Sequence, residues 1–153
     1  MATTLLDELK IVTWEEYTEL LEKLNREVML KSFDGIVAIG RGGAIIGAYL
    51  ASRMGIPTFY PVFIRHVGRG KDMQIVAHDL GRLNSLRGKL LIVDDWLCEG
   101  RAMRYILNRL PKEATPTTLV MYCRTGSEFK PDIVGKYVEE EKRLILFPYD
   151  LGT

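Results

Sequence analysis

Two short stretches of the chain carry residue types that could bind a sugar and an anion. In the first, Asp94 and Asp95 follow the apolar run 90–93, and Gly100 comes shortly after them. Paired carboxylates at a strand end can hold sugar hydroxyls or help to place Mg²⁺, and the following loop can receive a phosphate on a helix N-terminus. Aspartates also commonly cap a loop and stay solvated. The pattern by itself leaves both interpretations open.

The second stretch, Gly40 to Gly43, is predicted to be a Gly-rich loop between a strand and a helix. Its backbone N–H groups, the guanidinium of Arg41 and the helix N-terminus together suit a phosphate or pyrophosphate. The glycines do not fit G-x-G-x-x-G, however, and no Lys-Ser/Thr pair follows at P-loop spacing. A tight strand-to-helix turn with a solvated arginine is an equally good interpretation of these residues alone.

Cysteine and histidine give no further site. Cys98 and Cys123 are too few for a disulfide framework and form no C-x-x-C pair, so we expect reduced thiols. His66 and His78 have no recognisable spacing from Cys98, which argues against an activated thiol and against a Cys/His metal site. The acidic run 139–141 is expected to be a solvated hairpin tip.

The elements that must position these residues follow from periodicity. Thr13 and Glu16 form a capping box for an amphipathic helix that ends near Leu30, with Trp14 and Tyr17 as core or interface anchors. Strands are expected over 36–39, 57–64, 89–93, 117–123, 133–138 and 144–147, and helices over 44–54 and 101–110. Residues 65–87 lack a sustained period and are expected to form a long loop, with an edge strand near 73–76.

This alternation predicts one α/β domain over residues 1–153, with a mostly parallel central sheet of about five strands flanked by helices. Ligands of such sheets bind beyond the carboxyl ends of the strands. The formal net charge of +1 makes nucleic acid an unlikely partner, so any anion site must be local. The longest apolar stretches fall well short of the roughly 20 residues of a membrane span. No membrane is expected, and without a signal-peptide pattern the expected location is cytoplasmic.

These residues also carry a family resemblance. Leu91-Ile92-Val93-Asp94-Asp95 with Gly100 resembles the phosphoribosyl diphosphate (PRPP) signature of type I phosphoribosyltransferases, and residues 40–43 resemble their pyrophosphate loop. Residues 12–14 and 144–150 resemble the start and the closing strand of the short xanthine-guanine enzymes. The resemblance covers nearly the whole chain. It implies the type I phosphoribosyltransferase-like fold, with a small hood formed near the N- and C-termini.

The resemblance also implies a role for each motif. Asp94 and Asp95 would hold the ribose hydroxyls and help to place Mg²⁺, and residues 65–79 would be a mobile flap that closes over PRPP. The pyrophosphate and phosphate groups would be bound by Arg41, Gly42, Gly43, Cys98, Glu99, Gly100, Arg101, Ala102, Arg69 and Lys71, with Arg65 also in the flap. The base would be bound by Arg124, Leu144 and Ile145.

Several of these positions depart from the family pattern, which usually has Asp-Thr-Gly-x-Thr where this chain has residues 98–102. Cys98 replaces the aspartate thought to exchange a proton with purine N7, and a thiol with a pKa of about 8.5 is a poor substitute. Glu99 and Ala102 replace hydroxyls that bind phosphate. Arg124 replaces a lysine that meets the purine 6-oxo group, and Leu144 replaces a ring that stacks on the base, a role for which Tyr149 and Trp96 are candidates.

The resemblance implies an enzyme that transfers a phosphoribosyl group from PRPP to a 6-oxopurine with Mg²⁺ and releases pyrophosphate, working as a homodimer. The departures favour an alternative. In that alternative the chain is a catalytically impaired relative that binds a nucleotide or a PRPP-like anion and acts as a regulatory protein.

Overall fold

The computed structural model describes residues 4–68, 70–78 and 80–150. Its centre is a six-stranded sheet in the order β4-β3-β2-β5-β6-β7. The strands β3, β2, β5, β6 and β7 run parallel, and β4 pairs antiparallel with β3 at one edge. The predicted parallel sheet of about five strands is therefore confirmed. In chain order the elements are β1 (Leu9–Ile11), α1 (Trp14–Val28), β2 (Gly35–Ile39), α2 (Gly40–Met54), β3 (Phe59–Val67), η1 (Gly70–Asp72), β4 (Gln74–His78), η2 (Leu80–Ser85), β5 (Gly88–Leu97), α3 (Arg101–Leu107), β6 (Ala114–Arg124), β7 (Ile133–Val138), β8 (Leu144–Leu146) and η3 (Pro148–Asp150).

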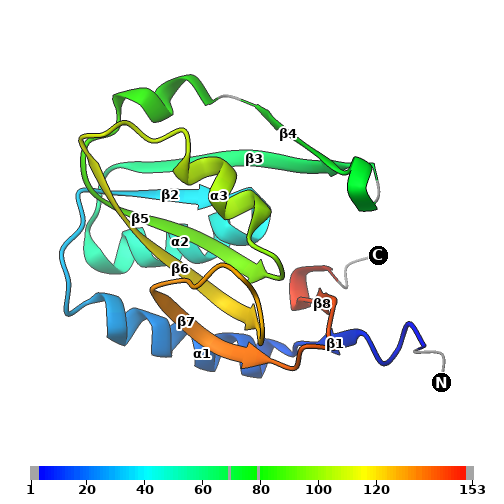
Figure 1. The fold of residues 1–153 in the computed structure, drawn as a ribbon. Coiled ribbons are helices and arrows are strands. Elements are labelled where there is room, and N and C mark those ends of the chain that lie inside the picture. The colour runs from blue at the N-terminus through cyan, green and yellow to red at the C-terminus, as the bar shows by residue number, and fades with distance from the viewer. Residues whose placement is uncertain (1–3, 69, 79, 151–153) are drawn as a thin grey trace.

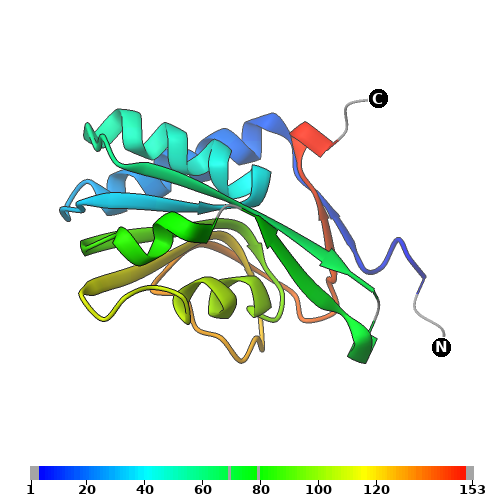
Figure 2. The same ribbon diagram turned by 90° about the horizontal axis from the view of Figure 1, so that it is seen from above.

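Helical segments cover both faces of the sheet, as Figure 2 shows. Alternate strand residues point to opposite faces, so Ile36 and Leu91 pack with α1 and α2, whereas Val37 and Ile92 pack with η2 and α3. Strands that are covered on both faces read as continuous apolar runs, which is why the central strands were predictable from the sequence. Within the described residues, no helix is long and apolar enough to cross a membrane.

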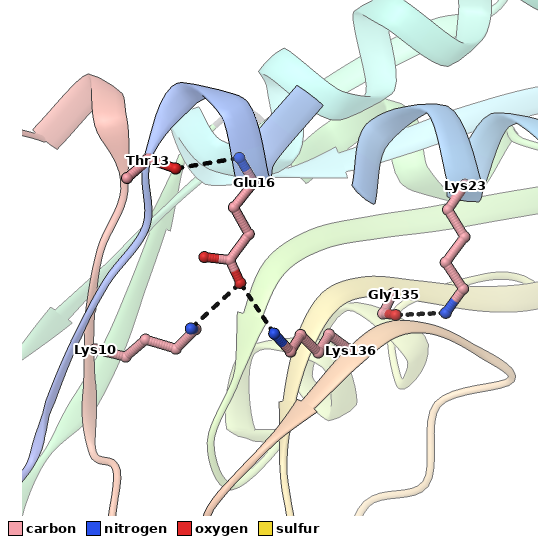
Figure 3. A network of polar contacts seen from close by, with 6 residues as sticks. All are labelled: Lys10, Thr13, Glu16, Lys23, Gly135 and Lys136. Atoms are coloured by element: carbon pink, nitrogen blue, oxygen red, sulfur yellow. Dashed lines mark hydrogen bonds and ion pairs between the residues drawn. The ribbon is translucent and has the colours of Figure 1, made fainter. Parts of the chain in front are cut away.

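The N-terminus of α1 confirms one half of the capping box. The Thr13 hydroxyl accepts a hydrogen bond from the Glu16 N–H at 3.2 Å. The Glu16 carboxylate does not reach back to the cap; it lies 3.3 Å from the ammonium groups of both Lys10 on β1 and Lys136 on β7 (Figure 3). Lys23 donates to the Gly135 carbonyl at 2.6 Å in the same view. These contacts tie α1 to both sheets.

A second, two-stranded parallel sheet of β1 and β8 stands apart from the main sheet (Figure 1). We call this sheet together with η3 the hood. The sequence did not predict β1, and the interpretation of residues 139–141 as a hairpin tip is wrong, because β7 belongs to the main sheet whereas β8 pairs with β1. The three glutamates are exposed, as expected.

The region predicted to be a long loop is largely ordered secondary structure. β3 continues to Val67 and forms an antiparallel hairpin with β4, in which His66 is paired with Ile75. The hairpin extends past the main sheet on the side where the hood lies (Figure 1). Backbone pairing thus overrides a polar, Gly-containing sequence without clear periodicity. The mobility of this flap stays a prediction.

Two further boundaries were misplaced. α2 already begins at Gly40, so the predicted loop 40–43 is the first turn of that helix. β5 likewise runs on to Leu97, because the backbone of Asp94 and Trp96 finds partners on β6. Trp14 is 60 % exposed, so it is not a core anchor, whereas Tyr17 is buried.

Candidate functional site

A cavity of about 450 Å³ lies beyond the carboxyl ends of β2 and β5. It brings together Arg41 and Gly42 from α2 with Asp94 and Asp95 from β5, so the two stretches singled out in the sequence converge as predicted. Among the described residues, the lining consists of Ile39, Gly40, Arg41, Gly42, Ile45, Ile64, His66, Asp94, Asp95, Trp96, Ala102, Tyr149 and Asp150. The cavity therefore combines cationic, acidic and apolar side chains.

The acidic part is the pair Asp94 and Asp95. The backbone N–H of Asp95 donates to Oδ1 of Asp94 at 2.8 Å. Burial, together with the negative charge of Asp95, raises the pKa of Asp94 well above its ordinary value of 3.8. The surroundings of Asp94 thus favour protonation of this carboxyl group more than an exposed aspartate would experience.

Asp95 is held from two sides. The Tyr149 hydroxyl on η3 donates to Oδ2 of Asp95 at 2.6 Å. Burial and the charge of Asp95 raise the pKa of Tyr149 above its ordinary value, so its hydroxyl stays protonated. On the other side, a Cβ at Gly42 would lie only 1.8 Å from the same oxygen. Glycine at this position leaves room for the Asp95 carboxylate, a requirement that the sequence did not reveal.

Gly43 has a different role. A Cβ at this position would approach the Val93 carbonyl oxygen to 2.5 Å, so Gly43 allows α2 to pack closely on β5. It does not line the cavity. Gly42 thus helps to form the cavity and Gly43 allows the helix to pack on β5, while phosphate binding by this stretch stays a prediction.

Of the predicted phosphate loop 98–102, only Ala102 lines the cavity. Glu99 forms an ion pair with Arg101 at 3.2 Å and approaches Arg143 to 4.0 Å, with all three side chains about half exposed. The Glu99 carboxylate, which replaces a phosphate-binding hydroxyl of the family, is therefore partly neutralised by its neighbours. Gly100 has a φ of +83°, and a Cβ there would meet Phe129 at 2.5 Å, so the turn requires glycine. Cys98 is a half-buried free thiol.

The three predicted base-binding residues lie outside the cavity. Arg124 is only 8 % exposed, and its guanidinium donates to the carbonyls of Cys98 at 3.3 Å and Glu140 at 3.4 Å. Leu144 is half exposed on β8, and Ile145 is buried in the core. Arg124 thus braces two loops, and its contact with a base stays a prediction.

The hairpin of β3 and β4 contributes residues to the cavity that were not among the predicted site residues. Ile64 and His66 line the cavity, and strand alternation directs Arg65 to the opposite face of β3. Lys71 is exposed in η1, and Arg69 lies outside the described residues. Trp96 and Tyr149, which were considered as stacking rings, also line the cavity. If the strand had been predicted to continue past Ile64, the alternation of its side chains would have placed Ile64 and His66 on the same face, the one that lines the cavity.

Comparison with known proteins agrees with this geometry. The phosphoribosyl transferase domain model matches residues 7–138. The xanthine-guanine phosphoribosyltransferases of Idiomarina loihiensis and Chromohalobacter salexigens are each 28 % identical to the chain, over 145 residues (92 % of this chain, 86 % of the relative) and 149 residues (93 % and 84 %), respectively. The crystal structure of a purine phosphoribosyltransferase from Pyrococcus horikoshii superimposes with a TM-score of 0.74 at 20 % identity, covering 95 % of this chain and 97 % of that one. The chain belongs to the phosphoribosyl transferase family.

Proposed function

We propose that this protein transfers the phosphoribosyl group of PRPP to a 6-oxopurine, namely guanine, xanthine or hypoxanthine, and releases pyrophosphate. Family membership supports the transfer, and the relatives at 28 % identity, which are named as xanthine-guanine enzymes, support the purine acceptor. The observation that carries the proposal is that Arg41, Gly42, Asp94 and Asp95 line the same cavity.

Each part of the donor has a counterpart in this cavity or in the loop beside it. The Arg41 guanidinium and the N-terminal turn of α2 suit the pyrophosphate. Asp94 and Asp95 suit the ribose hydroxyls, since one can donate and both can accept hydrogen bonds. The loop 98–102 suits the 5′-phosphate, provided that the ligand competes with Glu99 for Arg101.

Mg²⁺ fits as a companion of the donor. No group of three or more His, Cys, Asp or Glu side chains among residues 4–68, 70–78 and 80–150 could hold a metal by itself. Mg²⁺ is usually held by one or two carboxylates together with substrate phosphates, and Asp94 with Asp95 matches that donor set. Bound there, the ion would neutralise charge on the departing pyrophosphate.

In the proposed reaction the bond from C1′ of the ribose to pyrophosphate breaks and a bond from C1′ to a purine nitrogen forms. The transition state is oxocarbenium-like, so water must be excluded from C1′. His66 from the hairpin and Tyr149 from the hood both line the cavity, and their side chains suit the exclusion of water. The purine must give up a proton. Cys98 stands at the sequence position of the family's proton-exchanging carboxylate but lies outside the cavity, so we expect the proton to pass to solvent and turnover to be roughly 10²- to 10⁴-fold below that with a matched base.

Calorimetry with PRPP and Mg²⁺, with GMP as a control, tests binding, and pyrophosphate release with each of the three bases tests turnover. We expect PRPP to bind in a manner that Asp94→Asn and Asp95→Asn both weaken, and at least one base to react. Binding of PRPP or GMP without turnover of any base would favour the alternative, a regulatory relative. A chain that binds neither ligand would refute the proposal.

We also propose a homodimer in the cytoplasm, where PRPP and purine bases are found. The exposed side chains of Ile11 and Trp14 near the hood are 57 % and 60 % accessible and support a contact with a second copy. Light scattering at micromolar concentration tests this, and a monomer would refute it.

A further inference from the structure

Tyr149 is held in place by ring contacts and by the hydrogen bonds of its turn. Its ring stacks on Phe147 with a centroid distance of 5.2 Å and an interplanar angle of 3°. Tyr17 meets it edge-on at 5.7 Å. The turn beneath it is closed by two hydrogen bonds of 2.9 Å between Phe147 and Asp150. The hydroxyl of a clamped ring is thereby directed at one oxygen of Asp95, at 2.6 Å.

This contact sets the orientation of a group that would otherwise rotate. The terminal torsion of an aspartate is broad, so a carboxylate beside an open cavity has no single orientation of its own. At Asp95 the Tyr149 donor and the close approach of Gly42 restrict the carboxylate from two sides. Tyr149 engages one carboxylate oxygen, Oδ2, and a carboxylate has further lone pairs with which to accept from a ligand.

We propose that Tyr149 is a positioning residue for the sugar: its hydroxyl holds the Asp95 carboxylate in the orientation that accepts the ribose hydroxyls of PRPP. This rests on the proposed function, because it takes Asp95 as a ribose ligand. Tyr149 does not contact the reacting atoms in this role. It couples the hood to the sugar site through one hydrogen bond.

The hood is attached independently of this bond. Glu16 pairs with Lys10 of β1, the Val12 N–H donates to the Leu146 carbonyl at 2.9 Å, and Phe147 is buried in the core. Removing only the Tyr149 hydroxyl should therefore leave the hood in place. A selective effect on sugar binding separates positioning from a merely structural role.

Tyr17 supplies a matched control. Its ring belongs to the same aromatic cluster, and its hydroxyl is buried without a hydrogen-bond partner among the described residues. Tyr17→Phe removes the same kind of atom as Tyr149→Phe but no hydrogen bond to Asp95, whose charge affects the Tyr17 hydroxyl only through space. Both variants keep their ring packing, so both are expected to fold, which circular dichroism would check.

The test is calorimetry with PRPP and with inorganic pyrophosphate, each in Mg²⁺, on the wild type and both variants. Tyr149→Phe should weaken PRPP binding about tenfold or more, the usual effect of losing a hydrogen bond to a charged group. It should leave pyrophosphate affinity unchanged and reduce the preference for GMP over 2′-deoxy-GMP. Tyr17→Phe should change none of these values.

Two results would overturn the role of Tyr149 while leaving the proposed function intact: wild-type PRPP affinity in Tyr149→Phe, or an equal loss of PRPP and pyrophosphate affinity. A wild type that binds neither PRPP nor GMP would instead overturn the proposed function and the ribose role with it. A double-mutant cycle of Tyr149→Phe and Asp95→Asn on urea unfolding checks the contact without ligand. Non-additive effects are expected, and strictly additive effects would contradict the hydrogen bond.

Discussion

Replacing Gly42 by alanine is the sharpest test of how the acidic site is built. The added Cβ would lie 1.8 Å from Oδ2 and 2.2 Å from Cγ of Asp95, whereas real Cβ contacts are essentially never shorter than 3.0 Å. The carboxylate oxygen must therefore move by at least about 1.2 Å. We expect such a shift to break the bond to Tyr149 and to misplace the group proposed to bind ribose.

The magnitude follows from two opposing contributions to the free energy of unfolding. Alanine is favoured over glycine in a helix by up to about 1 kcal/mol. Loss of a hydrogen bond to a charged group costs about 1.5 to 3 kcal/mol. The net loss of about 0.5 to 2 kcal/mol corresponds to a fall in Tm of roughly 1 to 8 °C for a chain of this size. PRPP affinity should fall more, tenfold to about a hundredfold, because a misplacement of about 1 Å is costly at a binding site.

Thermal unfolding and PRPP calorimetry on Gly42→Ala give both quantities. Gly81→Ala is the control, because a Cβ there would meet nothing within 4 Å. Gly43→Ala is the contrast, since its Cβ would meet the backbone carbonyl of Val93 at 2.5 Å and should lower Tm more than Gly42→Ala does. The reasoning fails if Gly42→Ala binds PRPP within twofold of the wild type.

Three further predictions concern charge. The folded-state pKa of Asp94 is raised above 3.8, so ionisation of this group lowers the stability of the fold as pH increases. Asp94→Asn should therefore raise Tm relative to the wild type, and the gain should grow from acidic to neutral pH. A difference in Tm that is constant with pH would contradict this. At Glu16, burial raises the pKa, but the interactions with Tyr122, Lys10 and Lys136 lower it overall, so this group stabilises the fold above pH 4.5 and the stabilisation is lost as pH falls further. In urea unfolding at a series of pH values, Glu16→Gln should reduce the loss of unfolding free energy in acid. The same pH dependence as in the wild type would refute this. The triple change of Cys98→Asp, Glu99→Thr and Ala102→Thr should increase the affinity for PRPP about a hundredfold and raise turnover less, because it restores two hydroxyls and frees Arg101 from Glu99. Weaker PRPP binding by calorimetry would show that the loop is adapted to its own ligand.

The sequence predicted the sheet and the place of the site well, because both depend on local patterns. The apolar runs of β2 and β5 are long enough to identify strands covered on both faces, and parallel strands bring their carboxyl ends to one edge. Arg41 and Asp95 could therefore be expected at one cavity although they are far apart in the chain. Periodicity could not show that α2 starts at Gly40, since the stretch 40–43 has no apolar residue to define a helical face.

What the sequence missed depends on contacts between distant segments. β1 has three residues and is a strand only because β8 lies beside it. The bond from Tyr149 to Asp95 joins residues 54 positions apart, and no local spacing predicts it. Similarly, Glu16 looked like the second half of a capping box, but two lysines from other elements engage its carboxylate. Polar side chains with several possible partners are assigned by tertiary structure.

The distribution of the departures across the site has a consequence for function. Arg41, Gly42, Asp94 and Asp95, which match the family pattern, all line the cavity, where we propose that they bind the pyrophosphate and the ribose of the donor. Of the positions that depart from the pattern, Cys98, Arg124 and Leu144 lie outside the cavity, whereas Ala102 lines it and Glu99 pairs with Arg101 in the loop proposed to receive the 5′-phosphate. The departures therefore affect both the acceptor side and the 5′-phosphate end of the donor side. We expect PRPP to bind through the pyrophosphate and ribose contacts with an affinity reduced at the phosphate loop, and the choice of base to differ from that of the relatives, so donor binding is the property to measure first.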